Sequence, residues 1–285
     1  MTAEPAPRPS EAERWASDMG EKWNTHVDRF EGMLAPIGKA LIDAAEFQPG
    51  EHVIDIGCGA GPTTLEIARR VGPTGSATGL DISPALVTTA KRRAAQLGID
   101  NARFQVGDAS VADVGGARFD YLFSRFGIMF FSDPYAAFAH LHEFLRPGGR
   151  VMFACWGPQQ QNPWVVEVMG LIQKYVELPP PPPRAPGPFA FGDESYLRDI
   201  LGKADFKDVT LTAYRGEQYI GGPSSNAASA ARFLTETLFV GEMLKNLPEE
   251  RQKEAEAELV ELLARHEKDG SVQMGGMAWF VGARA

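Results

Sequence analysis

Three glycines and two aspartates are spaced along this chain in a pattern that suits a ligand carrying an adenosine group. Gly57, Gly59 and Gly61 stand at alternate positions directly after an apolar stretch. Glycine tolerates positive φ angles and lets a ligand approach the backbone closely. Asp81 lies about 20 residues beyond the last glycine, where a carboxylate can accept two hydrogen bonds from a ribose diol. Asp108 could accept from an adenine amino group, and the backbone N–H of the next residue could donate to a ring nitrogen.

The residues next to the glycines narrow the ligand class. Pro62 stands where the G-x-G-x-x-G pattern of dinucleotide-binding proteins needs its third glycine, which disfavours NAD and FAD. Asp55 precedes the glycines inside the apolar stretch, and a buried charge needs partners. Those partners could be backbone N–H groups of the glycine loop or the cationic end of a ligand. Purely structural roles also stay open: a simple glycine turn, a helix cap at Asp81 and a turn at Asp108.

The elements that must position these residues alternate between strands and helices. Apolar β-prone runs predict strands over 51–56, 76–80, 102–106, 119–124 and 150–155, and helical periodicity predicts helices over 62–71, 83–97 and 134–145. Such alternation is typical of right-handed βαβ units in a parallel sheet. Asp81, Asp108, Ser124 and the glycine loop would then share the carboxyl edge of the sheet, where ligands bind in these folds.

Composition and charge exclude several classes of protein. The net charge of −9 disfavours a protein that binds the nucleic-acid backbone, which would carry a basic face. Cys58 and Cys155 are the only cysteines, and two isolated cysteines give neither a disulfide framework nor a metal-ligand spacing. No run approaches 18 apolar residues, so we expect no membrane span. We expect a cytoplasmic protein.

Four segments taken in order carry a resemblance to a known family. VIDIGCGAG, GLDIS, VGDA and LRPGGRVMF, within residues 45–156, resemble the motifs of class I S-adenosylmethionine-dependent methyltransferases. The segment SRFGIMFFSDP at 124–134 resembles small-molecule members near the ubiquinone/menaquinone-biosynthesis group. The resemblance implies an α/β, Rossmann-like sheet of seven mostly parallel strands with helices on both faces. Its last strand would be antiparallel, in a hairpin formed by 209–214 and 278–283. It also implies S-adenosylmethionine as cofactor and S-adenosylhomocysteine as product.

The same resemblance assigns roles to individual residues. The three glycines would pass under the methionine and ribose portion, Asp81 would hold the ribose, and Ile82 would pack on the adenine. Asp108 and Ala109 would contact the adenine edge, and Ser124 would face the methionine end. The full set of implied cofactor contacts is Trp23, Asp55, Gly57, Cys58, Gly59, Gly61, Thr63, Asp81, Ile82, Asp108, Ala109, Ser124 and Arg125.

Two residues are candidates for work on the methyl acceptor. A phenol or a protonated amine would need a general base, and His26 in the N-terminal helices is the preferred histidine. Arg125, just past the fourth strand, could steer an anionic acceptor. No acid occupies that position, unlike in the metal-dependent catechol type, and no N/D-P-P-Y/F segment follows the strand. We therefore expect no metal, and no methylation of nucleic acid.

The segments outside the core should select the acceptor. We divide the chain into 1–10 (disordered), 11–45 (N-terminal helical lid), 46–156 (cofactor-binding core), 157–192 (insertion or cap), 193–220 (continuation of the core), 221–270 (helical cap) and 271–285 (last core strand). The lid and caps are rich in aromatic residues, which suits a small hydrophobic or aromatic acceptor methylated at oxygen or nitrogen. Two alternatives stay open: an NAD(P)-dependent oxidoreductase, and a non-catalytic regulatory protein of the same fold. The chain could act as a monomer or a homodimer.

Overall fold

Short runs of β-branched and aromatic residues build a sheet in which β1 (His52–Ile56) is central. In the computed structural model, which describes residues 10–115, 119–178, 182 and 184–285, β1 pairs in parallel with β2 (Ser76–Asp81) and β4 (Phe119–Arg125). Outside these lie β3 (Ala102–Val106) and β5 (Leu145–Trp156), also parallel to their neighbours. The strand order is β3-β2-β1-β4-β5-β8-β6. The parallel Rossmann-like core is confirmed.

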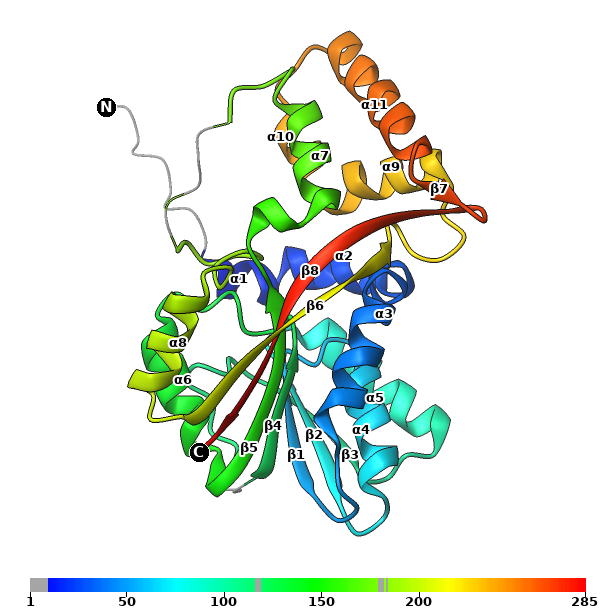
Figure 1. Cartoon of the computed structure of the whole chain (residues 1–285). Coiled ribbons are helices and arrows are strands. Elements are labelled where there is room, and N and C mark those ends of the chain that lie inside the picture. The colour runs from blue at the N-terminus through cyan, green and yellow to red at the C-terminus, as the bar shows by residue number, and fades with distance from the viewer. Residues whose placement is uncertain (1–9, 116–118, 179–181, 183) are drawn as a thin grey trace, which may run out of the picture.

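The antiparallel end of the sheet is also confirmed, and it is longer than predicted. β8 (Ser271–Arg284) runs antiparallel between β5 and β6 (Lys207–Tyr219). The prediction over 209–214 covers only the middle of β6. The prediction over 278–283 covers only the C-terminal part of β8, because Gly275 and Gly276 interrupt the apolar alternation of that strand. Both strands reach beyond the core toward a second group of helices (Figure 1). A short strand not predicted from the sequence, β7 (Glu267–Lys268), pairs with β8.

Helices cover both faces of the sheet. α3 (Val27–Ala45), α4 (Pro62–Val71) and α5 (Pro84–Leu97) lie on one side, and α6 (Pro134–Glu143) and α8 (Glu194–Lys203) lie on the other (Figure 1). Apolar side chains of α3 such as Ile37 and Leu41 are fully buried. Burial of this kind stabilises the fold by roughly 25 cal/mol per Å² of apolar surface removed from water.

The predicted helical lid, 11–45, consists of three helices. They are α1 (Glu11–Ala16), α2 (Asp18–Thr25) and the long α3, which continues through Pro36. Ser10 caps α1, since its hydroxyl accepts from the Glu13 N–H and Glu13 Oε2 accepts from the Ser10 N–H at 2.7 Å. The other residues predicted to be disordered, 1–9, lie outside the described residues, as does most of the proline run.

A second group of helices stands beyond the carboxyl ends of the parallel strands (Figure 1). It contains α7 (Pro163–Ile172), α9 (Ala227–Thr237), α10 (Val240–Leu244) and α11 (Glu249–Ala264), and the short 3-10 helix η1 (Gln159–Gln161) precedes α7. The predicted helix over 223–246 is divided into α9 and α10. Arg29 of α3 ties the group to the core, because its guanidinium donates to the carbonyls of Gly221 and Ser229, both at 2.8 Å. These helices therefore have a fixed attachment beside the sheet edge where the glycine loop lies.

Candidate functional site

The glycine loop adopts a backbone that only glycine fits without strain. Gly57, Gly59 and Gly61 have φ angles of 65°, 57° and 83°. The N–H groups of Gly57 and Cys58 both donate to the carbonyl of Leu80 in the neighbouring strand, at 2.8 and 3.2 Å. A Cβ on Gly57 would stand 2.5 Å from the Cα of Gly127. The loop is therefore pressed against two other segments of the core.

Asp81, at the end of β2, holds this loop by a hydrogen bond. Its Oδ2 accepts from the Gly59 N–H at 2.7 Å, and its Oδ1 accepts from the Ser83 N–H at 2.9 Å. Ser83, not Asp81, is the N-cap of α5, which removes the capping alternative for Asp81. Burial raises the pKa of the Asp81 carboxyl, and the two backbone donors oppose that shift. Each carboxylate oxygen keeps lone-pair capacity for one more donor, such as a ribose hydroxyl.

A cavity of about 220 Å³ opens over the loop at the carboxyl ends of the parallel strands. Nine of the predicted cofactor contacts line it: Trp23, Gly57, Cys58, Gly59, Asp81, Ile82, Asp108, Ala109 and Arg125. Its other end is apolar and aromatic, and is lined among others by Trp15, Phe126, Met129, Phe130, Phe131, Trp156, Trp164 and Leu238. The cavity thus joins a polar floor to an aromatic chamber.

Three of the predicted cofactor contacts lie beneath the loop instead of on the cavity wall. The Ser124 hydroxyl is fully buried, donates to the Ile56 carbonyl at 2.7 Å and accepts from the Gly127 N–H, so it does not face a ligand. Thr63 is turned toward Asp55, and Gly61 packs against the ring of Phe104. In this structure these three residues support the loop from below, and their direct contacts with the cofactor stay a prediction.

Asp55 is fully buried, and its partners differ from those predicted. Its Oδ2 accepts from the hydroxyls of Thr63 and Thr64 at 2.7 and 2.6 Å, rather than from backbone N–H groups of the loop. Its Oδ1 is buried and has no hydrogen-bond partner among the described residues. Burial raises the pKa of the Asp55 carboxyl to about 6, with the threonine hydroxyls and the Arg125 charge opposing the rise. An unpaired buried oxygen of this kind is costly in the absence of a ligand.

This burial predicts a specific pH dependence of stability. Because the folded-state pKa of Asp55 lies above the unfolded value of 3.8, the folded state binds more protons between about pH 4 and pH 6. The contribution of Asp55 to the free energy of unfolding should be full below pH 4 and decline by roughly 2–3 kcal/mol as the pH rises to 6. Asp55→Asn should remove this slope and stabilise the protein at pH 8, while it weakens cofactor binding. Urea unfolding of both proteins from pH 4 to pH 8 measures the difference, and equal slopes would contradict it.

Arg125 extends from the end of β4 toward α3 and α4. Its side chain lines both the main cavity and an adjoining cleft that also includes Gly38, Pro62 and Thr63. A Cβ on Gly38 would stand 2.9 Å from Arg125 Nη1, so a glycine in α3 makes room for the guanidinium. No hydrogen bond or ion pair to another described residue satisfies Arg125, and burial lowers its pKa while the charges of Glu31 and Asp55 oppose that shift. A half-buried guanidinium that makes no hydrogen bond to another described residue is suited to bind an anion.

No histidine lines the main cavity among the described residues. His26 stands at the junction of α2 and α3. The other four histidines contact other groups: His52 pairs with Ser76, His140 with the Ala112 carbonyl and His266 with Glu167, and His142 packs against the ring of Phe206. The role of His26 as a general base stays a prediction.

Two parts of the cavity wall were not predicted from the sequence. Glu31 of α3 lines the cavity and pairs with Arg93 of α5 at 2.6 Å. The run FGIMFF supplies Phe130 and Phe131 to the chamber. Its concentration of aromatic side chains directly after a strand end was the one available signal.

Asp108 lines the floor, and its Oδ1 accepts from the N–H and hydroxyl of Ser110.

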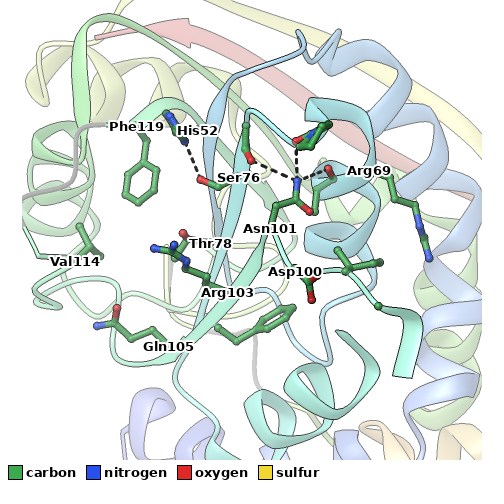
Figure 2. A pocket seen from close by; sticks show the side chains of 17 residues that line it. His52, Arg69, Ser76, Thr78, Asp100, Asn101, Arg103, Gln105, Val114 and Phe119 are labelled. Atoms are coloured by element: carbon green, nitrogen blue, oxygen red, sulfur yellow. Dashed lines mark hydrogen bonds between the residues drawn. The ribbon is translucent and has the colours of Figure 1, made fainter. Parts of the chain in front are cut away.

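A larger cavity of about 1100 Å³ lies at the opposite, amino edge of the strands (Figure 2). Several of its polar side chains bond to the protein: Asn101 Nδ2 donates to the carbonyls of Ala68, Gly72 and Gly75, and His52 pairs with Ser76. These contacts fix the loops that lead into β2 and β3. Because the glycine loop and its acids lie at the other edge, we assign the ligand site to the smaller cavity.

The described residues contain no cluster of three or more histidine, cysteine or acidic side chains arranged to hold a metal ion. They contain no helix that is long and apolar enough to cross a membrane.

Comparisons with known proteins point in one direction. A family model described as "Methyltransferase domain" matches residues 47–174. The chain is 34% identical over 120 residues to aklanonic acid methyltransferase DauC of Streptomyces sp., which covers 42% of this chain and 54% of that protein. It is 25% identical over 253 residues to nocamycin O-methyltransferase of Saccharothrix syringae, covering 83% and 86%. It is 26% identical over 189 residues to demethylmenaquinone methyltransferase of Staphylococcus epidermidis, covering 62% and 77%. The chain therefore spans about half of the first relative and most of the other two.

A solved structure shows the same fold over nearly the whole chain. Phosphoethanolamine N-methyltransferase 2 of Haemonchus contortus, in complex with S-adenosyl-L-methionine, superposes with a TM-score of 0.59 at 16% identity. The match covers 99% of this chain and 61% of that one. At this identity the likeness speaks for the fold alone. The ordered motifs, the sheet with its antiparallel end and the methyltransferase relatives together place this chain in the class I S-adenosylmethionine-dependent methyltransferases.

Proposed function

We propose that this protein transfers a methyl group from S-adenosylmethionine to an oxygen or nitrogen of a small hydrophobic or aromatic molecule. The observation that carries the proposal is the cavity itself, in which one end has the acids and glycines of a nucleoside site and the other is aromatic. The relatives named for aklanonic acid, nocamycin and demethylmenaquinone support a small-molecule acceptor.

The floor of the cavity fits an adenosine group. Asp81 is held in place by two backbone N–H groups and can accept from the ribose hydroxyls. Ile82 lines the same wall and offers an apolar surface for the adenine ring. Asp108 uses Oδ1 on Ser110, which leaves Oδ2 for the adenine amino group. Gly59 has no atom within 4 Å of where its Cβ would be, so the backbone is open to a ligand there.

The unpaired charges beside the loop fit the other end of the cofactor. A methionine end carries an ammonium and a carboxylate. Among the described residues beside the loop, Asp55 Oδ1 is buried without a hydrogen-bond partner and the Arg125 guanidinium is half-buried. Arg125 lies on the side of the loop that faces α3 and the start of α4. We assign it to the methionine carboxylate, which would give the guanidinium a charge-assisted partner.

The aromatic chamber is proposed to bind and orient the acceptor and to exclude water from it. S-adenosylmethionine supplies an activated methyl group, so the protein needs to bind, orient and exclude water. Phe126 stacks on Trp156 at 4.4 Å between ring centroids, and Trp15 contacts Phe130 edge-on at 5.2 Å. Such packed rings form a rigid apolar wall around the acceptor.

Calorimetry with the purified protein tests the cofactor, and labelled methyl transfer tests the reaction. We expect S-adenosylmethionine and S-adenosylhomocysteine to bind and NAD(P) to give no heat. Binding of NAD(P) alone would favour the oxidoreductase alternative. Tight binding of S-adenosylmethionine without transfer to any component of an extract of the cells that make the protein would favour the regulatory alternative.

Arg125→Gln tests the assignment of the guanidinium. We expect S-adenosylhomocysteine affinity to fall about 30- to 100-fold, because a charge-assisted pair to a buried carboxylate is lost. Arg70→Gln, which breaks a half-exposed pair with Asp43, is the control and should leave that affinity unchanged. An unchanged cofactor affinity with a raised acceptor KM would instead assign Arg125 to the acceptor.

A further inference from the structure

We infer that the acceptor of this enzyme is an oxygen acid, either a carboxylate or an enol of comparable acidity, which enters the chamber ionised and is held by indole N–H donors. The inference rests on the proposed function and narrows its substrate class. Three features of the chamber carry it: the side chains that could act as a base are occupied, two buried donors lack acceptors, and the surroundings are apolar.

No described residue lining the cavity is free to act as a general base. The lining contains no histidine, lysine or tyrosine among the described residues. Its acids are Glu31, Asp81 and Asp108, of which the first pairs with Arg93 and the other two are assigned to the ribose and the adenine of the cofactor. The Cys58 thiol is buried, and its pKa lies well above the ordinary value because of that burial. An acceptor that reaches this chamber must therefore be nucleophilic before it arrives.

Two indole groups at the chamber are donors without acceptors. Trp164 of α7 is 6% exposed, and its Nε1–H has no hydrogen-bond partner among the described residues. The buried Nε1–H of Trp15 in α1 is in the same state. Both residues line the cavity, in two separate aromatic clusters: Trp164 packs on Trp156, and Trp15 on Trp23 and Phe130. An indole N–H can only donate, so its complement is an oxygen with lone pairs. An ammonium would bring further donors and leave both groups unsatisfied.

Trp279 shows how an indole is satisfied elsewhere in the same fold. Its Nε1–H donates to the Gly192 carbonyl at 3.1 Å, outside the cavity. Buried tryptophans normally find such a partner. Trp15 and Trp164 differ from Trp279 in two respects: both residues line the cavity, and neither buried N–H has an acceptor among the described residues.

The apolar wall favours an anion reacting with a sulfonium. The acceptor anion and the sulfonium attract each other more strongly when water is excluded. Their charges cancel as the methyl group is transferred, and in a dry chamber this step does not require water to leave the anion. The acceptor oxygen forms a bond to the methyl carbon while the carbon–sulfur bond breaks and its electron pair stays on sulfur. The products are a neutral methyl ester or enol ether and neutral S-adenosylhomocysteine, and no proton has to be moved. The reaction thus matches a chamber without a base.

Fractionation of the acceptors tests this class. An extract of the producing cells is separated on an anion exchanger at pH 7, and each fraction is incubated with the enzyme and methyl-labelled S-adenosylmethionine. We expect the label in molecules from the retained, acidic fraction, and we expect those products to pass through the exchanger after losing one negative charge. Labelled products arising from the neutral and basic fraction would overturn the inference but leave the proposed function intact. No label in any fraction, despite measured cofactor binding, would contradict the proposed function itself.

Phenylalanine variants test the donors. Trp164→Phe and Trp15→Phe keep the ring but remove the N–H, and we expect kcat/KM for the isolated acceptor to fall about 5- to 20-fold through KM. S-adenosylhomocysteine affinity should stay within twofold, which also shows that each variant is folded. Trp279→Phe, which removes a satisfied donor outside the cavity, should leave the acceptor KM unchanged. Equal acceptor KM values in all three variants would rule out the indole donors as the recognition groups.

Discussion

Replacement of Gly57 by alanine is expected to abolish measurable cofactor binding and to destabilise the protein by about 3–5 kcal/mol. Two effects add at this position. A φ of 65° is strained for alanine, and the new Cβ would stand 2.5 Å from the Cα of Gly127, which is backbone and cannot turn away. Relief of the overlap must move either the loop or the segment after β4, and both line the cavity. We expect the affinity for S-adenosylhomocysteine to fall at least about 100-fold, equivalent to about 2.7 kcal/mol.

Gly98→Ala separates strain from overlap. Gly98 ends α5 with a similar φ of 62°, and no atom lies within 4 Å of where its Cβ would be. This variant should lose only about 1 kcal/mol of stability and bind the cofactor normally. Urea unfolding and calorimetry on the two variants give both quantities. A Gly57→Ala variant that behaves like Gly98→Ala would show that the loop is not held by the contact with Gly127.

Asp81→Ala is the second large effect, and it should appear mainly in binding. The substitution removes the carboxylate that is proposed to accept from the ribose. It also removes the hydrogen bond from the Gly59 N–H, which holds the glycine loop where the ligand would contact that loop. We expect S-adenosylmethionine affinity to fall about 100- to 1000-fold, or about 3–4 kcal/mol. The stability of the protein without ligand should change little, because removal of a buried carboxylate offsets the two unsatisfied N–H groups.

Asp193→Ala is the matched control for Asp81. Asp193 also accepts from two backbone N–H groups, those of Ser195 and Tyr196, but it does so as the N-cap of α8 away from the cavity. It should cost about 1 kcal/mol of stability and leave cofactor binding unchanged. If Asp81→Ala bound the cofactor as tightly as Asp193→Ala does, the carboxylate at the end of β2 would have no role in binding.

The local signals of the core were strong enough to predict it from the sequence. The alternation of apolar runs and helical periodicity predicted five parallel strands, and the glycine motif with Asp81 and Asp108 predicted the edge at which a ligand binds. These features depend on residues close together in the chain, namely a turn that needs glycine and an acid at a strand end. The family follows from the order of those motifs.

Only the tertiary structure decided what each polar group contacts. Ser124 and Thr63 stand in the right motifs, yet their hydroxyls are turned under the loop toward Ile56 and Asp55. His26 lies between the N-terminal helices and does not line the cavity. The direction of a side chain depends on the packing of elements that are distant in the chain, and that packing cannot be predicted from the sequence pattern.

The sequence alone was therefore enough to predict the edge of the sheet at which the cofactor binds, because backbone geometry and strand order depend on local residue type. The tertiary structure decided the acceptor end, where α1, the run after β4, α7 and the segment after α9 bring Trp15, Phe130, Trp164 and Leu238 to one chamber. It also left two indole N–H groups of that chamber without partners among the described residues. A missing partner is a property of the assembled interior, since it requires every neighbouring element to be in place.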